Sequence, residues 1–104
     1  MKKIINGKRY DTEKANLVGE YSHLYPSDFN YVEEALYVTP ISRQYFLAGK
    51  GGANTKYSQS VSQNSWIGGE KIIPLSRDDA FEWAHRHLME DEVEAEFLDL
   101  IKDA

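Results

Sequence analysis

The segment Gln44–Tyr57, QYFLAGKGGANTKY, decides the fold of this chain. Its apolar, aromatic-rich beginning predicts a strand over Gln44–Gly49. That strand runs into a loop that holds three glycines, two lysines and an asparagine. The sequence before it supplies short β-elements, and the sequence after it leads to two acidic helices. We therefore place this strand at the centre of a small sheet.

Two further stretches predict strands on the N-terminal side. Tyr31–Thr39 alternates as a strand does, with Val32, Leu36 and Val38 on one side and Tyr31, Glu33, Ala35, Tyr37 and Thr39 on the other. Pro40–Arg43 turns the chain into the central strand. Near the start, Asn6-Gly7 predicts a hairpin between Lys2–Ile5 and Lys8–Tyr10, because both turn residues tolerate the positive φ of a type I′ turn.

In the segments between and after these strands, capping residues, turn-forming residues and a proline indicate the local structure. Asp11 or Thr12 is expected to cap a short helix that ends at Gly19, and Glu20–Asn30 is expected to be a loop. Polar Ser58–Ser65 predicts an exposed loop, which ends in an apolar anchor at Trp66-Ile67. A short strand then follows over Glu70–Leu75, which Pro74 confines to an edge or an end.

The C-terminal part predicts two helices. Ser76 is suited to cap the first, in which Ala80, Phe81, Ala84 and Leu88 share one face with Trp83 and His87 at its margin. Glu90-Asp91 interrupts it, and Val93, Phe97, Leu100 and Ile101 form the apolar stripe of the second. The expected fold is a single α+β domain over residues 1–104: a small antiparallel sheet, made of the N-terminal hairpin and the central strands, covered on one face by helices.

Composition limits the cellular setting. The 104 residues include no cysteine, which excludes a disulfide scaffold and fits a reducing cytoplasm. The first residues lack an apolar run long enough for a signal peptide, and no stretch approaches the roughly 18 apolar residues of a membrane-spanning helix. We expect a cytoplasmic protein.

Charge is divided unevenly along the chain. The part from Arg77 onward holds ten of the seventeen acidic residues and three of the twelve basic ones, so it carries −7 and the remainder +2. Along the last helix, Glu92, Glu96, Asp99 and Asp103 form a single-sign ridge opposite the core side. Like charges at these spacings each cost roughly 0.2–0.5 kcal/mol. The ridge therefore indicates a basic partner, although solvating charge alone is the simpler explanation.

No residue pattern in the sequence identifies an enzymatic reaction. Gly49-Lys50-Gly51-Gly52 lacks the spacing of a Walker loop or a dinucleotide turn, so no cofactor is expected. Glu82-x-x-His85 is half of a di-iron pattern without its second half, and His85 and His87 diverge on a helix; no metal site is expected. Without cysteine or a nucleophile elbow, no catalytic residue is expected either. The loop then offers polar partner contacts, Lys50, Asn54, Lys56 and Tyr57, and Trp66 is expected to add a further contact to the partner.

Three segments resemble a small uncharacterised family encoded in Gram-positive bacteria, often on phages, plasmids and conjugative elements. The segments are IINGKRYDTEKANLVGEY, YVEEALYVTPISRQYFLAGKGGANTKYS and NSWIGGEKIIPLSRDDAFEWAHRHL. The resemblance carries no catalytic motif. It implies a setting in which small acidic proteins often block host defences, such as anti-CRISPR and anti-restriction proteins; this step is analogy.

Two functions follow as expectations. The first is a non-enzymatic protein that binds a basic, nucleic-acid-handling partner and inhibits a defence complex, most specifically a Cas9-type nuclease whose basic channel the acidic helix occludes. The second is a nucleic-acid-binding accessory or regulatory protein of a mobile element. That protein would use the basic residues of the hairpin and the glycine loop: Lys2, Lys3, Lys8, Arg9, Lys50 and Lys56.

Overall fold

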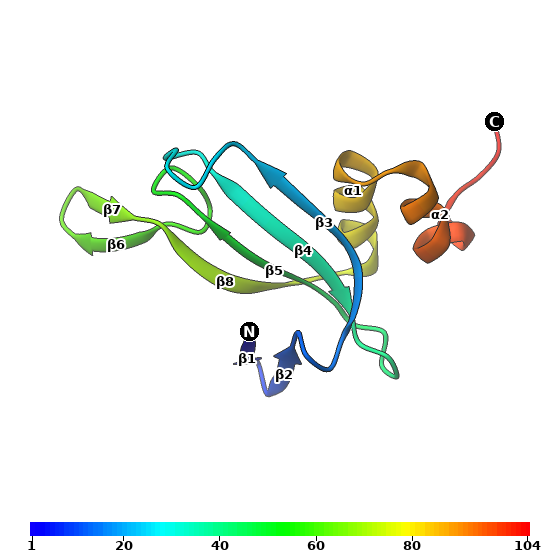
Figure 1. The fold of residues 1–104 in the computed structure, drawn as a ribbon. Helices are drawn as coiled ribbons and strands as arrows, with labels where there is room; N and C mark the ends of the chain where they lie inside the picture. Colours follow the sequence, from blue (N-terminus) through cyan, green and yellow to red (C-terminus); the bar gives the residue numbers. More distant parts are fainter.

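A four-stranded antiparallel sheet forms the centre of the molecule in the computed structural model, which describes residues 1–104 (Figure 1). Its strands, in spatial order, are β3 (Asn16–His23), β4 (Val32–Val38), β5 (Tyr45–Gly51) and β8 (Gly69–Leu75). The predicted strand pair around Pro40–Arg43 is confirmed: β4 and β5 are the two inner strands, joined by that turn. β8 lies at an edge, as its proline requires.

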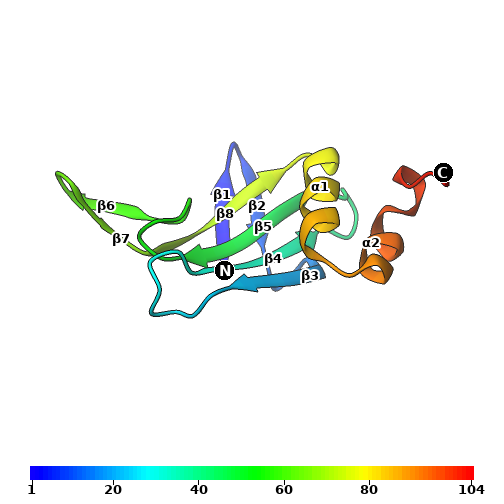
Figure 2. The same ribbon diagram turned by 90° about the horizontal axis from the view of Figure 1, so that it is seen from above.

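The N-terminal hairpin forms a separate two-stranded sheet from β1 (Lys2–Ile5) and β2 (Lys8–Asp11). Asn6 and Gly7 have φ of 51° and 78°, so the predicted turn is confirmed. The hairpin does not extend the central sheet. It packs on the face away from the helices, where Tyr10 meets Phe46 edge-on with ring centroids 5.3 Å apart and Ile72 completes a small cluster (Figure 2).

Helices cover the other face of the central sheet. They are α1 (Arg77–His87) and α2 (Glu90–Phe97), with a 3₁₀ turn, η1 (Leu98–Leu100), after them. The predicted start of α1 is confirmed, since the amide of Asp79 donates to Ser76 Oγ at 3.1 Å. The main core lies between this face and the helices: Leu36, Val38, Tyr45, Leu47, Ala80, Trp83, Ala84, Val93 and Phe97. The α+β class with C-terminal helices is therefore confirmed, and neither helix is long and apolar enough to cross a membrane.

The predicted helix ending at Gly19 is wrong, because β3 begins at Asn16 and pairs with β4 along its length. The carboxylate of Asp11 does accept an amide hydrogen bond, from Glu13 at 3.0 Å, but it closes a turn instead of capping a helix. Gly19 lies at a β-bulge, where an added Cβ would lie 2.6 Å from Leu88 Cδ1. Its role is close packing against the helical layer. The loop predicted from Glu20 accordingly begins only after His23.

The segment predicted as the loop Ser58–Ser65 is a second hairpin. It consists of β6 (Gln59–Ser62) and β7 (Ser65–Ile67), and Asn64 supplies the positive φ of its turn. Its exposure is as predicted, but the expected apolar anchor is wrong: Trp66 is 57% exposed and Ile67 49%. Figures 1 and 2 show this hairpin projecting beyond the central sheet, at the end opposite the helices.

Candidate functional site

Glu34 is the one buried charged side chain, 4% exposed, on the helix-facing side of β4. Three donors from distant parts of the chain converge on it. Tyr57 Oη donates at 2.6 Å, Trp83 Nε1 at 2.9 Å, and Lys56 Nζ lies 2.7 Å away. The carboxylate therefore joins the central sheet, the glycine loop and α1.

The protonation states in this network follow from its contacts. Burial acts to raise the pKa of Glu34, but the hydrogen bonds from Lys56, Trp83 and Tyr57 together outweigh it and hold that pKa below its ordinary value. Burial, followed by the bond to Glu34, raises the pKa of Tyr57. Near neutral pH the glutamate is thus charged and the tyrosine protonated. No buried side-chain polar atom lacks a partner, so the network holds the loop in place.

His87 stands at the open side of this network, at the end of α1. Its ring stacks on Tyr21 of β3, with centroids 4.0 Å apart, and lies against Trp83. Burial lowers the pKa of His87, with Arg86 and Lys56 adding to the effect and Glu34 opposing it. A hollow of about 330 Å³ lies there, with His23, Asn30 and Asn54 among its lining residues.

The predicted glycine loop is shorter than expected, because β5 runs to Gly51 and includes Lys50. The residues predicted there as partner contacts differ in exposure. Tyr57 is buried, and its ring lies where a Cβ on Gly49 would fall, so the prediction that it lies on the surface is wrong. Lys56 is half-exposed but paired with Glu34. The side chain of Asn54 is exposed, and its backbone N–H fixes the loop by donating to Phe29 O at 2.8 Å.

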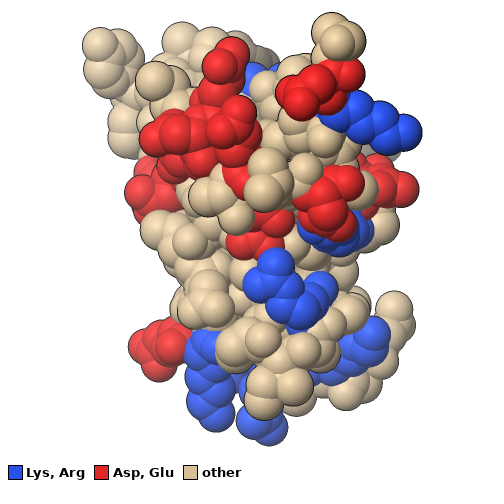
Figure 3. All heavy atoms as spheres, turned by 90° about the vertical axis from the view of Figure 1, so that its right-hand side faces the viewer, with Lys and Arg blue, Asp and Glu red and all other residues tan.

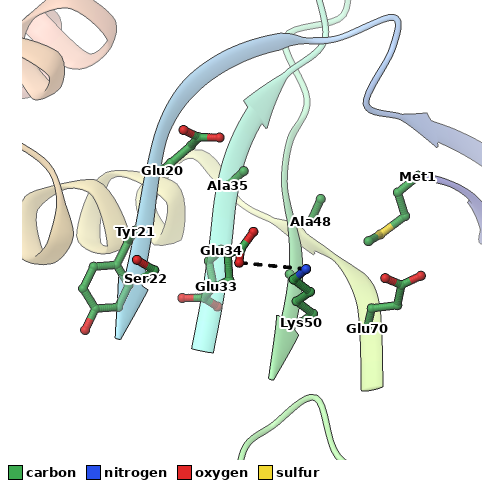
Figure 4. Close-up of a pocket in the computed structure, with 11 residues that line it drawn as sticks. Met1, Glu20, Tyr21, Ser22, Glu33, Glu34, Ala35, Ala48, Lys50 and Glu70 are labelled. Carbon is green, nitrogen blue, oxygen red and sulfur yellow. Dashed lines mark ion pairs between the residues drawn. The ribbon is translucent and has the colours of Figure 1, made fainter. Parts of the chain in front are cut away.

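Lys50 belongs to a row of polar side chains on the open sheet face. The strand register aligns Ser22, Glu33, Lys50 and Glu70 across the four strands, and Lys50 Nζ lies 3.9 Å from Glu33 Oε2. The row lines a groove of about 470 Å³, and Figure 4 shows its side chains on the four strands. In the next row on this face, the two inner strands β4 and β5 carry the small side chains Ala35 and Ala48. The arrangement is an open, polar surface in which the lysine is flanked by carboxylates.

The predicted acidic ridge does not form. α2 ends at Phe97, so Asp99 lies in η1 and Asp103 beyond any regular element. Glu96 accepts from Tyr45 Oη at 2.6 Å and from Arg43. The Asp99 carboxylate accepts two bonds from Arg77, at 2.7 and 2.5 Å, and Arg77 thereby lowers its pKa.

Glu92 is also used inside the fold, because its carboxylate accepts from the amide of Met89 at 3.2 Å and caps α2. Three of the four ridge carboxylates thus stabilise the molecule itself. The ridge fails for two reasons. Tertiary contacts use Glu96, and α2 ends at Phe97, so Asp99 lies outside the helix and is bound by Arg77 of α1.

Other carboxylates on the two helices remain exposed and outside any ion pair. We call this set the acidic pole: Asp78, Asp79, Glu82, Glu90, Asp91 and Glu94. Figure 3 views the molecule from the right-hand side of Figure 1, where the helices lie. Carboxylates gather over the upper half of this view, and most lysines and arginines over the lower half. The N-terminal hairpin carries Lys2, Lys3, Lys8 and Arg9, none of them in an ion pair.

Sequence reasoning missed the roles of Glu34 and Trp83. The signal was present, because Glu34 falls on the inward side of β4 together with Val32, Leu36 and Val38. A carboxylate among inward apolar residues needs donors, and the nearby tryptophan and tyrosine supply them. No three His, Asp or Glu side chains converge on a point where they could hold a metal ion.

Comparison of the chain with protein-family models, with curated protein sequences and with solved structures finds no match.

Proposed function

We propose that this chain is a non-enzymatic binding protein that inhibits a nucleic-acid-targeting defence complex. In the most specific form of the proposal, the partner is a Cas9-type nuclease and the acidic pole enters the basic channel that holds guide and target. Such channels bind nucleic acid chiefly through its backbone charge, which carboxylates on a rigid surface can imitate. The partner acts in the cytoplasm, and we place this protein there.

The observation that carries the proposal is the unopposed charge of the acidic pole. Ion pairs within the molecule use other carboxylates, while Glu90, Asp91 and Glu94 on α2 stay free. Clustered carboxylates are all negative, so they repel one another and weaken the fold unless a cationic surface binds them. The same field accelerates association with a basic groove. The resemblance to proteins of mobile elements supports this choice of partner by analogy alone.

The test is binding to guide-free and guide-loaded Cas9 from several sources, read together with DNA cleavage. We expect association that weakens steeply with salt. The variant Glu90→Gln/Asp91→Asn/Glu94→Gln removes three charges from the pole, whereas Glu13→Gln/Glu20→Gln/Glu70→Gln removes three exposed charges elsewhere. Only the first is expected to lose binding. Equal losses from both variants would show that net charge and not the pole is recognised.

A second candidate function rests on the N-terminal hairpin. Its outward face places Lys2 and Arg9 beside the exposed Ile4. Asp11 lies opposite Lys2 on this face, but neither cation forms an ion pair. Such a surface suits the phosphates of a nucleic acid. A mobility-shift titration at low salt tests it: a complex lost in Lys2→Gln/Arg9→Gln supports this function, and the absence of any complex excludes it.

A further inference from the structure

The hairpin β6–β7, which we call the ribbon (Gln59–Ile67), has no second layer. Every residue of its two strands is exposed, including Val61, Trp66 and Ile67. A two-stranded hairpin alone is marginally stable in water, and further strands or a covering layer are needed to hold it. Exposed apolar side chains on a projecting element are also a common mark of a contact surface.

The base of the ribbon is rigidly built. A Cβ on Gly68 would lie 2.6 Å from Gly51 O, and one on Gly52 would lie 2.5 Å from Phe29 O. Backbone therefore packs on backbone where the ribbon leaves the sheet, and this fixes the direction in which the ribbon projects. The neighbouring loop adds two exposed rings, Tyr25 (80%) and Phe29 (69%). Phe29 and Trp66 line a cleft of about 670 Å³, whose other lining residues include Asp28, Lys50 and Glu70.

Charge narrows the choice of partner. No charged residue occurs from Tyr57 to Gly69, although 28% of the chain is charged. Such a surface has no cation for a phosphate backbone and no charge to meet a charged protein groove. Its amide, hydroxyl and aromatic side chains resemble those of protein-binding loops. The matching surface is an uncharged one on a protein.

The overall charge layout favours a second copy of this chain as that protein. The ribbon and the helices lie at opposite ends of the molecule, whose longest extent is 48 Å (Figure 1). Two chains of net charge −5 repel each other, but contact through the ribbons keeps the acidic poles far apart. That separation exceeds the screening length of about 8 Å at physiological salt.

We propose that the ribbon is a self-association surface through which two copies form a two-fold symmetric dimer. The two ribbons lie side by side and antiparallel, so that the tip of each reaches Tyr25 and Phe29 at the base of the other. Two two-stranded hairpins thereby support each other as a four-stranded layer. The dimer presents two acidic poles at its outer ends, which adds avidity to binding of a partner with more than one basic site.

Sedimentation velocity of the full chain at increasing concentration tests the proposal. We expect a monomer–dimer equilibrium that changes little with salt, because the two ribbons that meet along their length carry no charged residue. Trp66→Lys is expected to weaken dimerisation by at least about a hundredfold, since the two-fold axis introduces the unfavourable residue twice. Glu94→Lys, at the far end, serves as the matched control and is expected to leave dimerisation intact. Circular dichroism verifies that both variants are folded.

Cross-linking gives a second measurement, because the chain contains no cysteine of its own. Val61→Cys places a thiol in the middle of the ribbon, and Glu94→Cys places one at the acidic pole. Under mild oxidation the first is expected to form a covalent dimer quickly and the second slowly. A monomer at every concentration, a dimer that Trp66→Lys leaves unchanged, a dimer that dissolves in salt, or equal cross-linking of the two variants would each overturn the proposal.

Discussion

Trp83 Nε1 of α1 donates a hydrogen bond to Glu34 Oε1 of β4, 2.9 Å away and out of contact with bulk water. The bond fixes how α1 lies on the sheet, because the indole is rigid and the carboxylate is held from two further sides. The same glutamate binds Tyr57 at the end of the glycine loop. One buried charge thus sets the relative positions of helix, sheet and loop.

Replacement of Glu34 by glutamine is expected to destabilise the fold strongly. The uncharged amide loses the charge-assisted bond to Lys56, and its single oxygen cannot accept all the bonds that Lys56, Tyr57 and Trp83 donate to the two carboxylate oxygens. We expect a loss of about 2–4 kcal/mol in the free energy of unfolding, measured by urea denaturation. Glu33→Gln is the control at the next, half-exposed position, and its loss is expected to be about 1 kcal/mol or less. A smaller loss for Glu34→Gln than for Glu33→Gln would contradict this account.

His87 is expected to make the fold less stable in mild acid. In the unfolded chain its pKa is near 6.5, and in the folded protein burial lowers it. As the pH falls through about 6.5, the unfolded state therefore takes up the proton first and the free energy of unfolding decreases. His87→Gln is expected to flatten that slope, by up to about 1.4 kcal/mol per pH unit. The exposed His85→Gln is the control, and an identical slope in both variants would disprove the role of His87.

Strand pairing around the centre of the sheet was predictable because two local signals agreed there. Alternation in Val32–Val38 and the apolar run at Tyr45 both specified strands, and the turn residues between them required a reversal. Asn16–His23 gave no such agreement. Gly19 has the appearance of a helix stop, yet the bulge and the contact with Leu88 that explain it involve residues far along the chain.

The candidate site was less predictable for the same reason. Whether Glu96 or Asp99 is free depends on Arg43, Tyr45 and Arg77 lying beside them, which only the tertiary fold brings about. Helical periodicity correctly ordered the residues of α2 but extended the helix past its end at Phe97. The unpaired carboxylates of the acidic pole could therefore be identified only once the contacts of Glu96 and Asp99 were known.

Glu96→Gln is expected to cost about 1–2 kcal/mol of stability, because its mostly buried carboxylate holds Tyr45 and Arg43 against α2. Asp99→Asn is expected to cost less, since the carboxylate is exposed and solvent replaces the bonds to Arg77. Thermal unfolding of the two variants measures the difference. The opposite order would mean that the Arg77 pair, and not Glu96, secures the C-terminal segment.

Gly52→Ala is expected to disturb the base of the ribbon. The new Cβ would lie 2.5 Å from Phe29 O and 2.7 Å from Asp28 O, both backbone atoms that cannot move alone. We expect a loss of about 1–3 kcal/mol in unfolding free energy. Gly19→Ala serves as the comparison, because its nearest atoms belong to the flexible end of Leu88. A Gly52→Ala variant as stable as the parent would show that the loop backbone is not held as described.

The most direct test of the central claim is DNA cleavage by guide-loaded Cas9 enzymes from several sources in the presence of excess protein. The proposal predicts that at least one is inhibited by the parent chain and by Glu13→Gln/Glu20→Gln/Glu70→Gln, but not by Glu90→Gln/Asp91→Asn/Glu94→Gln, which removes charge from the acidic pole. Unchanged cleavage by every enzyme at large molar excess would contradict the Cas9 form of the proposal. Inhibition that survives the loss of the three α2 charges would contradict the assigned surface.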